Sequence, residues 1–278
     1  MAERVKPLAT VSMDSLVPEW PKDQPSSGHW MHAEVSPRRV RVVFGGETLA
    51  DSKRAVLLRE AKRLPAYYFP QQDVRMDFMQ PSGRRTPDDH KGEAVYWTLR
   101  ANSKTVENAA WSYAEPPRAC AAIKDHFAFE WSAMDGWYEE DEEIFVHARD
   151  PYKRVDAIRS ARRVQISVAG ATVADTRRPT LVFETGHPVR YYIPLDDIRR
   201  DLLIASDTSS RCPYKGLASY WSVKAGGEVH PDLAWSYRDT IPECPKIKDL
   251  VCFFQEREAV IAVDGEELPR LSTKWSRS

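Results

Sequence analysis

The sequence is poor in the features that mark metal sites, membrane proteins and secreted proteins. Its 278 residues include four cysteines, and no two of these form a Cys-x-x-Cys pair, so we expect no structural zinc site. No apolar stretch approaches the roughly 20 residues that a membrane helix needs. The first residues (MAERVK) lack the hydrophobic core of a signal peptide. We therefore expect a protein of the reducing cytoplasm.

The charge balance is nearly neutral, which removes one class of partner. The chain has 40 basic and 41 acidic residues, and its net charge is −1. It therefore has no overall attraction for nucleic acid or for an anionic membrane, and we expect neither as a partner. The longest charged run, residues 139–143 (EEDEE), is predicted to be a solvated loop between two parts of the chain.

Several catalytic and nucleotide-binding motifs are absent as well. The chain has no Gly-x-x-x-x-Gly-Lys-Ser/Thr loop, no Gly-x-Gly-x-x-Gly, no His-Glu-x-x-His and no Gly-x-Ser-x-Gly. These absences leave no motif support for a P-loop NTPase, a Rossmann enzyme, a zinc protease or an α/β-hydrolase. No cofactor and no metal are expected.

What the sequence does contain is an internal duplication. Residues 67–74 (YYFPQQDV), 91–97 (KGEAVYW) and 111–113 (WSY) each recur 124 residues later, as YYIPLDDI, KGLASYW and WSY. One offset shared by three separated blocks indicates a duplicated domain. We predict an irregular N-terminal arm over residues 1–37, a first copy over 38–150 and a second copy over 151–278. Trp20 and Trp30 suggest that the arm docks on a domain.

Each copy has the pattern of a small, mainly β domain. Residues 39–44 and 47–51 flank a two-glycine turn, which is typical of a hairpin, and residues 164–168 and 172–175 repeat the pattern. Further short strands are expected in each copy, with one more over residues 144–147. Only residues 117–127 and 244–253 look helical, about one helix per copy. The fold class is therefore mainly β, built from two tandem antiparallel domains.

Residues shared by the two copies mostly suit a structural role. The repeated aromatic residues are expected to fill the core, and the repeated aspartates to cap turns. Two polar pairs are candidates for more, namely Glu60 with its counterpart Glu184 and Lys91 with its counterpart Lys215. A lysine that is partly buried beside a tyrosine can bind an anionic group or have a lowered pKa. The alternative is that these residues are solvated or pair with each other.

Residues that differ between the copies favour the second copy as the one with a working site. That copy reads ETGHPVRYY at residues 184–192 and RCPYKG at 211–216, whereas the first copy lacks the matching histidine and cysteine. His187 suits acid–base work near neutral pH, Lys215 is a second candidate, and Cys212 suits a nucleophile if a neighbouring charge lowers its pKa. The expected ligand-binding residues are Glu184, Arg190, Tyr191, Tyr214 and Trp221. The alternative is structural, with His187 capping a Gly-His-Pro turn and Cys212 as a small buried hydrophobe.

Taken together, the motifs of the second copy resemble a known family. Residues 184–194 (ETGHPVRYYIP), 212–216 (CPYKG), 218–221 (ASYW) and 234–237 (AWSY) resemble the bacterial and fungal family catalogued as domain of unknown function number 427. The resemblance covers residues 39–135 and 163–264. It implies a β-tent or Mss4-like fold of two antiparallel sheets and no established reaction. The family sometimes carries a nucleotidyltransferase-like label, but no Gly-Ser motif with paired aspartates is present here.

Two functions remain open at this stage. The first is binding of a small polar or anionic molecule in a pocket of the second copy, with acid–base chemistry by His187 or Lys215 as its enzymatic form. The second is a non-catalytic interaction module, in which the copies pack as an internal pseudo-dimer, in a monomer or a homodimer. Exposure of Trp20, Trp30 or Trp137 would favour the second function.

Overall fold

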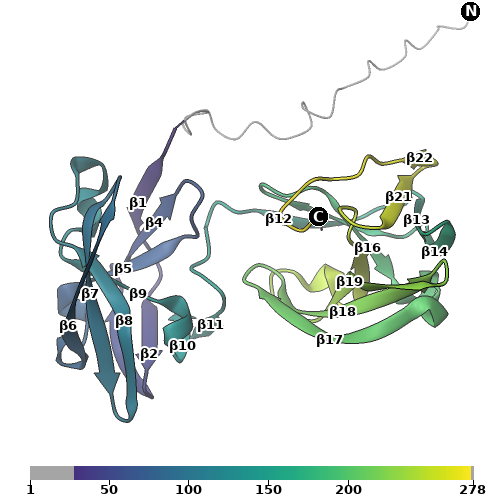
Figure 1. The fold of residues 1–278 in the computed structure, drawn as a ribbon. Coiled ribbons are helices and arrows are strands. Elements are labelled where there is room, and N and C mark those ends of the chain that lie inside the picture. The colour runs from purple at the N-terminus through teal and green to yellow at the C-terminus, as the bar shows by residue number, and fades with distance from the viewer. Residues whose placement is uncertain (1–27, 277–278) are drawn as a thin grey trace, which may run out of the picture.

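The computed structural model describes residues 28–276, which form two β units joined by one linker (Figure 1). Each unit contains one seven-stranded and one four-stranded antiparallel sheet. The strands of the first copy are β1 (Met31–Val35), β2 (Val40–Phe44), β3 (Glu47–Ser52), β4 (Val56–Glu60), β5 (Ala66–Pro70), β6 (Met79–Asp88), β7 (Gly92–Ala101), β8 (Lys104–Tyr113), β9 (His126–Phe129), β10 (Gly136–Glu139) and β11 (Glu142–Ile144).

The second copy repeats this set strand for strand. Its elements are β12 (Val155–Arg159), β13 (Val164–Val168), β14 (Ala171–Thr176), β15 (Thr180–Glu184), β16 (Arg190–Pro194), β17 (Leu203–Cys212), β18 (Gly216–Ala225), β19 (Glu228–Thr240), β20 (Leu250–Phe253), β21 (Ala259–Val263) and β22 (Glu266–Glu267). The large sheets have the orders β1-β4-β5-β9-β8-β7-β6 and β12-β15-β16-β20-β19-β18-β17. The duplicated, mainly β fold predicted from the sequence is thereby confirmed.

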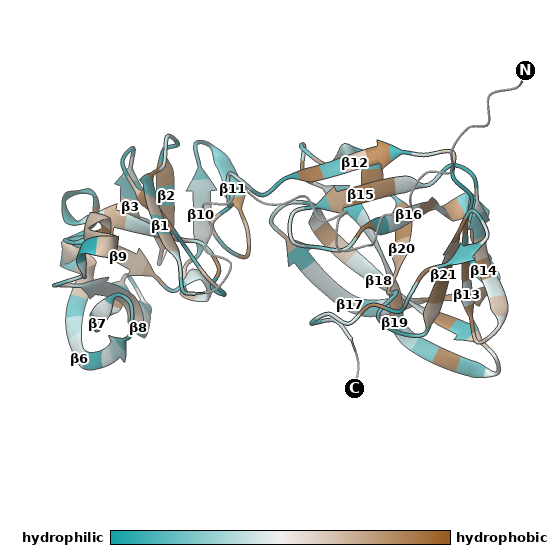
Figure 2. Cartoon of the chain, turned by 90° about the horizontal axis from the view of Figure 1, so that it is seen from above, coloured by the Kyte–Doolittle hydropathy of each residue, from teal (hydrophilic) through white to brown (hydrophobic). Residues whose placement is uncertain are grey.

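The largest buried cluster of each copy joins residues of its two sheets, and the first copy has a second, smaller cluster on its large sheet. In β2, Val40, Val42 and Phe44 are buried and the residues between them are not. Buried residues alternate in the same way on β13 and β21, whereas the central strand β20 has three consecutive buried residues (Figure 2). The predicted hairpins are present, and Gly45 and Gly46 adopt the positive φ values of 61° and 78° that such a turn requires.

The two predicted helices are present only as short 3-10 helices, and the rest of each segment is not helical. Residues 117–127 form the short 3-10 helix η4 (Arg118–Ile123) and the start of β9, and residues 244–253 form η8 (Pro245–Ile247) and β20. The apolar ends of both segments (HFAF and LVCF) lie in the middle of a sheet, between two neighbouring strands. The other helical elements are also 3-10 turns: η2 (Gln71–Asp73), η3 (Met76–Phe78), η5 (Trp131–Ala133), η6 (Leu195–Asp197) and η7 (Arg200–Leu202).

Two further expectations differ from the structure near the ends of the first copy. The acidic run at residues 139–143 is the β10–β11 hairpin of the first copy, not a loop between copies, and the side chain of Glu139 is only 1% exposed. The expected strand at 144–147 ends at Ile144. Within the predicted arm, residues 31–35 form β1, which pairs with β4, and the Trp30 carbonyl accepts a hydrogen bond from the amide of Ala61. Trp20 lies outside the described residues.

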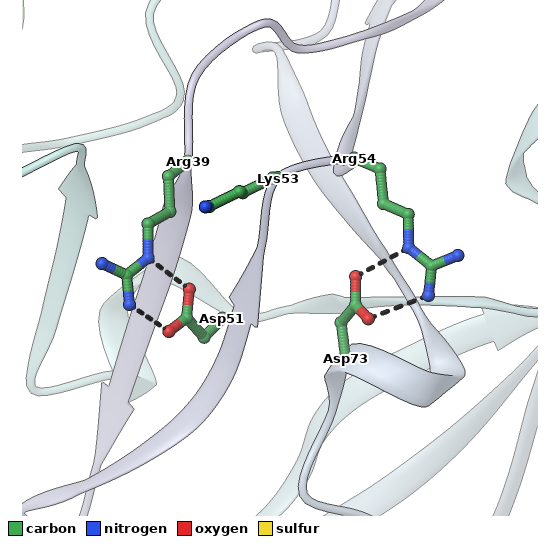
Figure 3. A pocket seen from close by; sticks show the side chains of 5 residues that line it. All are labelled: Arg39, Asp51, Lys53, Arg54 and Asp73. Atoms are coloured by element: carbon green, nitrogen blue, oxygen red, sulfur yellow. Dashed lines mark hydrogen bonds and ion pairs between the residues drawn. The ribbon is translucent and has the colours of Figure 1, made fainter.

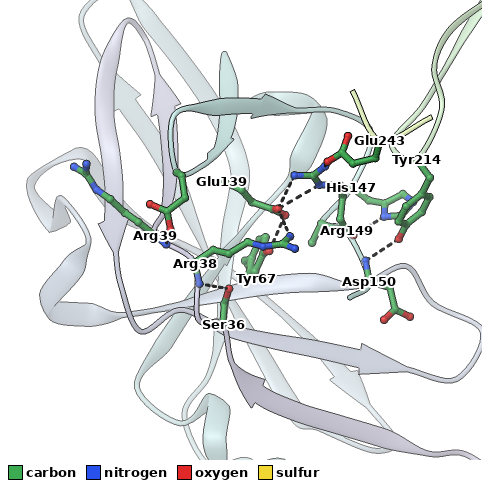
Figure 4. Close-up of polar contacts among 12 residues, drawn as sticks. Ser36, Arg38, Arg39, Tyr67, Glu139, His147, Arg149, Asp150, Tyr214 and Glu243 are labelled. Atoms are coloured by element: carbon green, nitrogen blue, oxygen red, sulfur yellow. Dashed lines mark hydrogen bonds and ion pairs between the residues drawn. The ribbon is translucent and has the colours of Figure 1, made fainter. Parts of the chain in front are cut away.

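Polar contacts of the linker tie the two copies together (Figure 4). Arg149 donates to Glu139 of the first copy at 3.0 Å and to Glu243 of the second at 3.0 Å. One residue later, the amide of Asp150 donates to the hydroxyl of Tyr214 at 2.7 Å. In residues 28–276, no helix has the length and apolar character needed to cross a membrane.

Candidate functional site

A buried lysine–glutamate pair occupies the same place in both copies. In the first copy, the Nζ of Lys91 lies 2.6 and 2.8 Å from the two carboxylate oxygens of Glu60, and these side chains are 2% and 5% exposed. In the second copy, Lys215 pairs with Glu184, and both side chains are less than a tenth exposed. Replacing a buried ion pair by packed apolar groups is often neutral or stabilising, so stability alone does not account for its presence twice.

The glycine after each lysine explains how the chain places the pair. Gly216 has a φ of 120°, and a Cβ atom there would lie 2.1 Å from the carbonyl oxygen of Asp239. Only glycine fits this close approach of two backbones. Lys215 thereby ends a tight turn from β17 into β18, and its side chain reaches Glu184 at the end of β15.

In the first copy the lysine is fully satisfied. Besides the two oxygens of Glu60, Asp88 Oδ2 lies 3.0 Å from the Nζ of Lys91. An ammonium group has three N–H donors, so these three oxygens take them all. Arg63 adds a second cation at the rim, 3.4 Å from Glu60 and 3.1 Å from Asp88. The first site therefore balances two cations with two carboxylates.

In the second copy the balance is different because Cys212 stands where the first copy has Asp88. Within the described part of the chain, Glu184 is the one carboxylate that pairs with Lys215. Lys153, from the linker, lies 3.0 Å from the same carboxylate, and His187 Nδ1 lies 3.6 Å from it. Two lysines thus share one glutamate, which leaves one positive charge uncompensated and N–H donors free.

The electrostatics of the second site follow from burial and from this cluster. Burial raises the pKa of the Glu184 carboxyl, but Lys215, Lys153 and His187 outweigh it and hold that pKa below its ordinary value. For Lys215, burial lowers the pKa, and Glu184 outweighs it and raises the pKa above its ordinary value. Burial lowers the pKa of His187, more than Glu184 raises it, so the imidazole is neutral at pH 7.

The structure brings together five of the eight residues predicted for the site, and Arg190 forms a separate contact. Glu184, His187 and Lys215 form the cluster, and Cys212 and Tyr214 lie in the turn that carries Lys215. Arg190 forms a separate buried pair with Glu256, at 2.5 and 2.8 Å. Its guanidinium lies 5.5 Å from the ring of Trp235 and 5.3 Å from that of Trp275.

The other two predicted residues, Tyr191 and Trp221, lie outside the cluster. Side chains alternate along a strand, so Tyr192 and Tyr220, their neighbours, share the face of the sheet that carries the lysine. The first copy shows this directly, since Tyr68 and Tyr96 line a pocket with Lys91, whereas Tyr67 reaches Glu139 instead. Trp221 donates to Ser236 at 3.4 Å.

Two residues of the site were missed by sequence reasoning. Lys153 lies in the segment predicted as a linker, where nothing marks it as a site residue, although its counterpart 124 residues earlier, His29, lies 3.0 Å from Glu60. Cys244 recurs at the same offset from Cys120, and this spacing is a signal that could have been read. Burial raises the pKa of Cys244 to about 11, so its thiol stays protonated at neutral pH.

The first copy has a small pocket above its lysine–glutamate pair. Its volume is about 190 Å³. Polar groups form one side and aromatic rings the other, and the lining residues are Leu58, Glu60, Arg63, Leu64, Ala66, Tyr68, Lys91, Tyr96, Trp111 and Tyr113. Such a combination of an aromatic wall with a few converging polar groups is common in sites for small ligands.

A second hollow of the first copy has a volume of about 580 Å³ (Figure 3). The arginines and aspartates that line it already pair with one another. Arg39 forms a two-pronged pair with Asp51, and Arg54 forms another with Asp73, while Lys53 lies between the pairs. The same pairs recur in the second copy, as Arg163 with Asp175 and Arg178 with Asp197. We infer that these ion pairs have a structural role and hold strands and turns together.

Comparison with known proteins follows the duplication. A family model described as a domain of unknown function (DUF427) matches residues 32–140 and again residues 156–265. The chain belongs to this family. Both matched segments coincide with the two β units, so this is a tandem DUF427 protein, and each copy contributes one lysine–glutamate pair. A search of curated proteins finds no match. In the described residues of this DUF427 chain, no group of three or more His, Cys, Asp or Glu side chains is placed to hold a metal ion.

Proposed function

We propose that the second copy binds a small anionic molecule at the cluster of Glu184, Lys215, Lys153 and His187. The observation that supports this most is the charge imbalance, with two lysines on one carboxylate. At the equivalent place in the first copy, Asp88 removes the imbalance by pairing with Lys91. A carboxylate or phosphate group of the ligand would restore neutrality by accepting hydrogen bonds from the two ammonium groups.

Partial exposure makes the cluster reachable. The side chains of Lys215, Lys153 and His187 are 9%, 19% and 23% exposed, whereas Lys91 is 2% exposed. Tyr214 adds a wall, with the Nζ of Lys153 lying 5.2 Å from its ring. A desolvated site of this kind strengthens each contact between a ligand anion and the lysines.

The enzymatic form of this proposal uses His187 as a base. Its pKa is lowered by burial, so at neutral pH the imidazole can accept a proton from a bound molecule. Lys215, whose pKa is raised, stays charged and would stabilise the anion that forms. Cys212 lies in the turn that carries Lys215, and it is half-buried.

A first experiment is mass spectrometry of the freshly purified full chain, native against denatured. A bound small mass that is released on denaturation and absent from a Lys215→Met variant supports the site. The second experiment is calorimetric titration with inorganic phosphate and with succinate. We expect Lys215→Met to weaken binding at least about tenfold, and Lys224→Met, an exposed lysine of β18, to leave it unchanged.

Titrations that show no saturable binding of either anion, together with a clean native mass, would refute the proposal and favour the interaction module. That module gains no support from Trp137, which is 3% exposed and packs in the first core. Equal weakening by both lysine variants would indicate a general charge effect instead of a site.

A further inference from the structure

The pocket of the first copy has a different chemistry from the cluster of the second. We propose that it is a separate binding site for one neutral, planar aromatic ring that carries a hydrogen-bond acceptor. The proposal rests on the pocket's walls, its size, its closed charge balance and one unpaired hydroxyl. It goes beyond the anion site and does not depend on it.

Four aromatic side chains from three strands form the walls, Tyr68 from β5, Tyr96 from β7, and Trp111 and Tyr113 from β8. The indole nitrogen of Trp111 donates to the hydroxyl of Tyr68 at 3.4 Å. Tyr96 is held by a hydrogen bond of 2.9 Å with Thr86. Aromatic rings attract another ring through stacked or edge-to-face contacts, so fixed rings of this kind favour a flat ligand.

The size of the pocket limits the ligand to about one ring. Its volume is about 190 Å³. An apolar protein cavity of roughly 150 Å³ accepts benzene, so a single six-membered ring with a small substituent fits here. A nucleotide or another drug-sized molecule needs roughly 300 Å³ or more.

The polar floor of the pocket does not select for a charged ligand. The three donors of Lys91 are taken by Glu60 and Asp88. The same Glu60 carboxylate also lies 3.0 Å from the Nε2 of His29 and 3.4 Å from Arg63. Two cations face two carboxylates, so an incoming anion or cation would have to displace an existing partner. A neutral molecule displaces none.

One polar group remains for directional recognition. Among residues 28–276, no protein group accepts a hydrogen bond from the hydroxyl of Tyr113, which is 5% exposed and lines the pocket. Burial raises the pKa of this hydroxyl above its ordinary value, which keeps it a proton donor. A ligand acceptor in the pocket could therefore take the hydrogen bond that this hydroxyl does not give to the protein.

In the second copy, protein side chains occupy the equivalent space. Arg190 stands where the first copy has Ala66, and both residues pair with the same position of the neighbouring strand. Its guanidinium lies between Trp235, the counterpart of Trp111, and Trp275 of the C-terminal segment. Thr273 of that segment donates to Glu256, the partner of Arg190, at 2.9 Å. The open pocket is therefore a property of the first copy's small Ala66.

The test is ligand-observed NMR on the full chain with phenol, benzoate and tetramethylammonium as probes. For a ligand of this size we expect phenol to bind with a Kd of about a millimolar. Ala66→Arg, which copies the second copy, should abolish phenol binding, and Ala114→Arg, at an exposed position of the first copy, should leave it intact. Tyr113→Phe keeps the wall and should weaken binding about fivefold.

Phenol binding that survives Ala66→Arg would overturn the proposal, as would a preference for tetramethylammonium, or for benzoate in a Lys215→Met chain that lacks the anion site of the second copy. Absence of binding by all three probes would do the same. The phosphate titration of the second copy should be unaffected by Ala66→Arg, so failure at one site is distinguishable from failure at the other. A thermal unfolding curve of each variant establishes that the first copy is folded in the comparison.

Discussion

Cys212 occupies, in the second copy, the position at which Asp88 of the first copy lies 3.0 Å from the Nζ of Lys91. This single difference changes a lysine with three satisfied donors into one that has donors to spare. The two lysines are otherwise placed by the same Lys-Gly turn and face the same glutamate position. The lost carboxylate, together with the exchange of His29 for Lys153 and of Arg63 for His187, separates a neutral site from a cationic one.

Restoring the carboxylate should abolish the anion site. In Cys212→Asp, we expect the new carboxylate to pair with Lys215 and to weaken phosphate binding by at least about tenfold. Calorimetric titration measures the change. The reciprocal variant, Asp88→Cys, should create weak phosphate binding in the first copy. If Cys212→Asp bound phosphate as tightly as the parent chain, the charge argument would be wrong.

Loss of the lysine should cost more stability in the first copy than in the second. Lys91→Met leaves both Glu60 and Asp88 buried without that partner, and breaking such a pair costs about 3–5 kcal/mol. In Lys215→Met, Glu184 keeps Lys153 at 3.0 Å, so we expect less than half that loss. Urea unfolding of the two variants measures the difference. Equal losses would contradict the unequal pairing of the two sites.

Acid should remove the contribution of Glu184 to stability. Its pKa in the folded chain is below the ordinary value of 4.5, so the contribution is fully present above pH 4.5 and is lost as the pH falls through the folded value. The destabilisation caused by Glu184→Gln should therefore be largest at neutral pH and should shrink on acidification. Thermal unfolding between about pH 7 and 3 measures this change.

That comparison is best made in a His187→Gln background. Burial lowers the pKa of His187, so the contribution of the histidine to stability is fully present above pH 6.5 and is lost as the pH falls through its lower folded value. Removing it leaves the glutamate as the titrating group of the cluster. A destabilisation by Glu184→Gln that stayed constant with pH would show that the carboxylate is not ionised in the folded protein.

Arg149 should contribute both to the stability of the first copy and to the placement of the second copy, because it contacts a glutamate in each. It donates to Glu139, whose side chain is 1% exposed, and also to Glu243 (Figure 4). Arg149→Ala leaves Glu139 with Arg38 as its remaining guanidinium, and we expect a loss of about 1–3 kcal/mol in urea unfolding. Glu243→Ala, more exposed, should leave stability unchanged.

Small-angle scattering separates the two roles of that arginine. Both variants release the contact between Arg149 and Glu243, so both should widen the distribution of distances between the copies. A stability loss in Arg149→Ala without any change in scattering would show that the hydrogen bond of Asp150 to Tyr214 suffices to hold the linker.

The sequence by itself determined the duplication, most strands and the recurrence of Glu184 and Lys215 as counterparts of Glu60 and Lys91. These follow from short-range patterns, since a strand alternates every two residues and a fixed offset repeats each pattern in the second copy. Prediction from local patterns failed where contacts with strands that are distant in sequence determine the structure. Residues 117–127 and 244–253 look helical alone but complete the middle of a sheet.

Only the tertiary structure decided which side chains meet. Strand pairing places Tyr192 and Tyr220, and not Tyr191 and Trp221, on the face that carries Lys215. It also brings Lys153 from the linker to Glu184, and pairs Arg190 with Glu256 across 66 residues. Such contacts depend on the register between distant strands, which is set by packing of the whole core and leaves no local mark in the sequence.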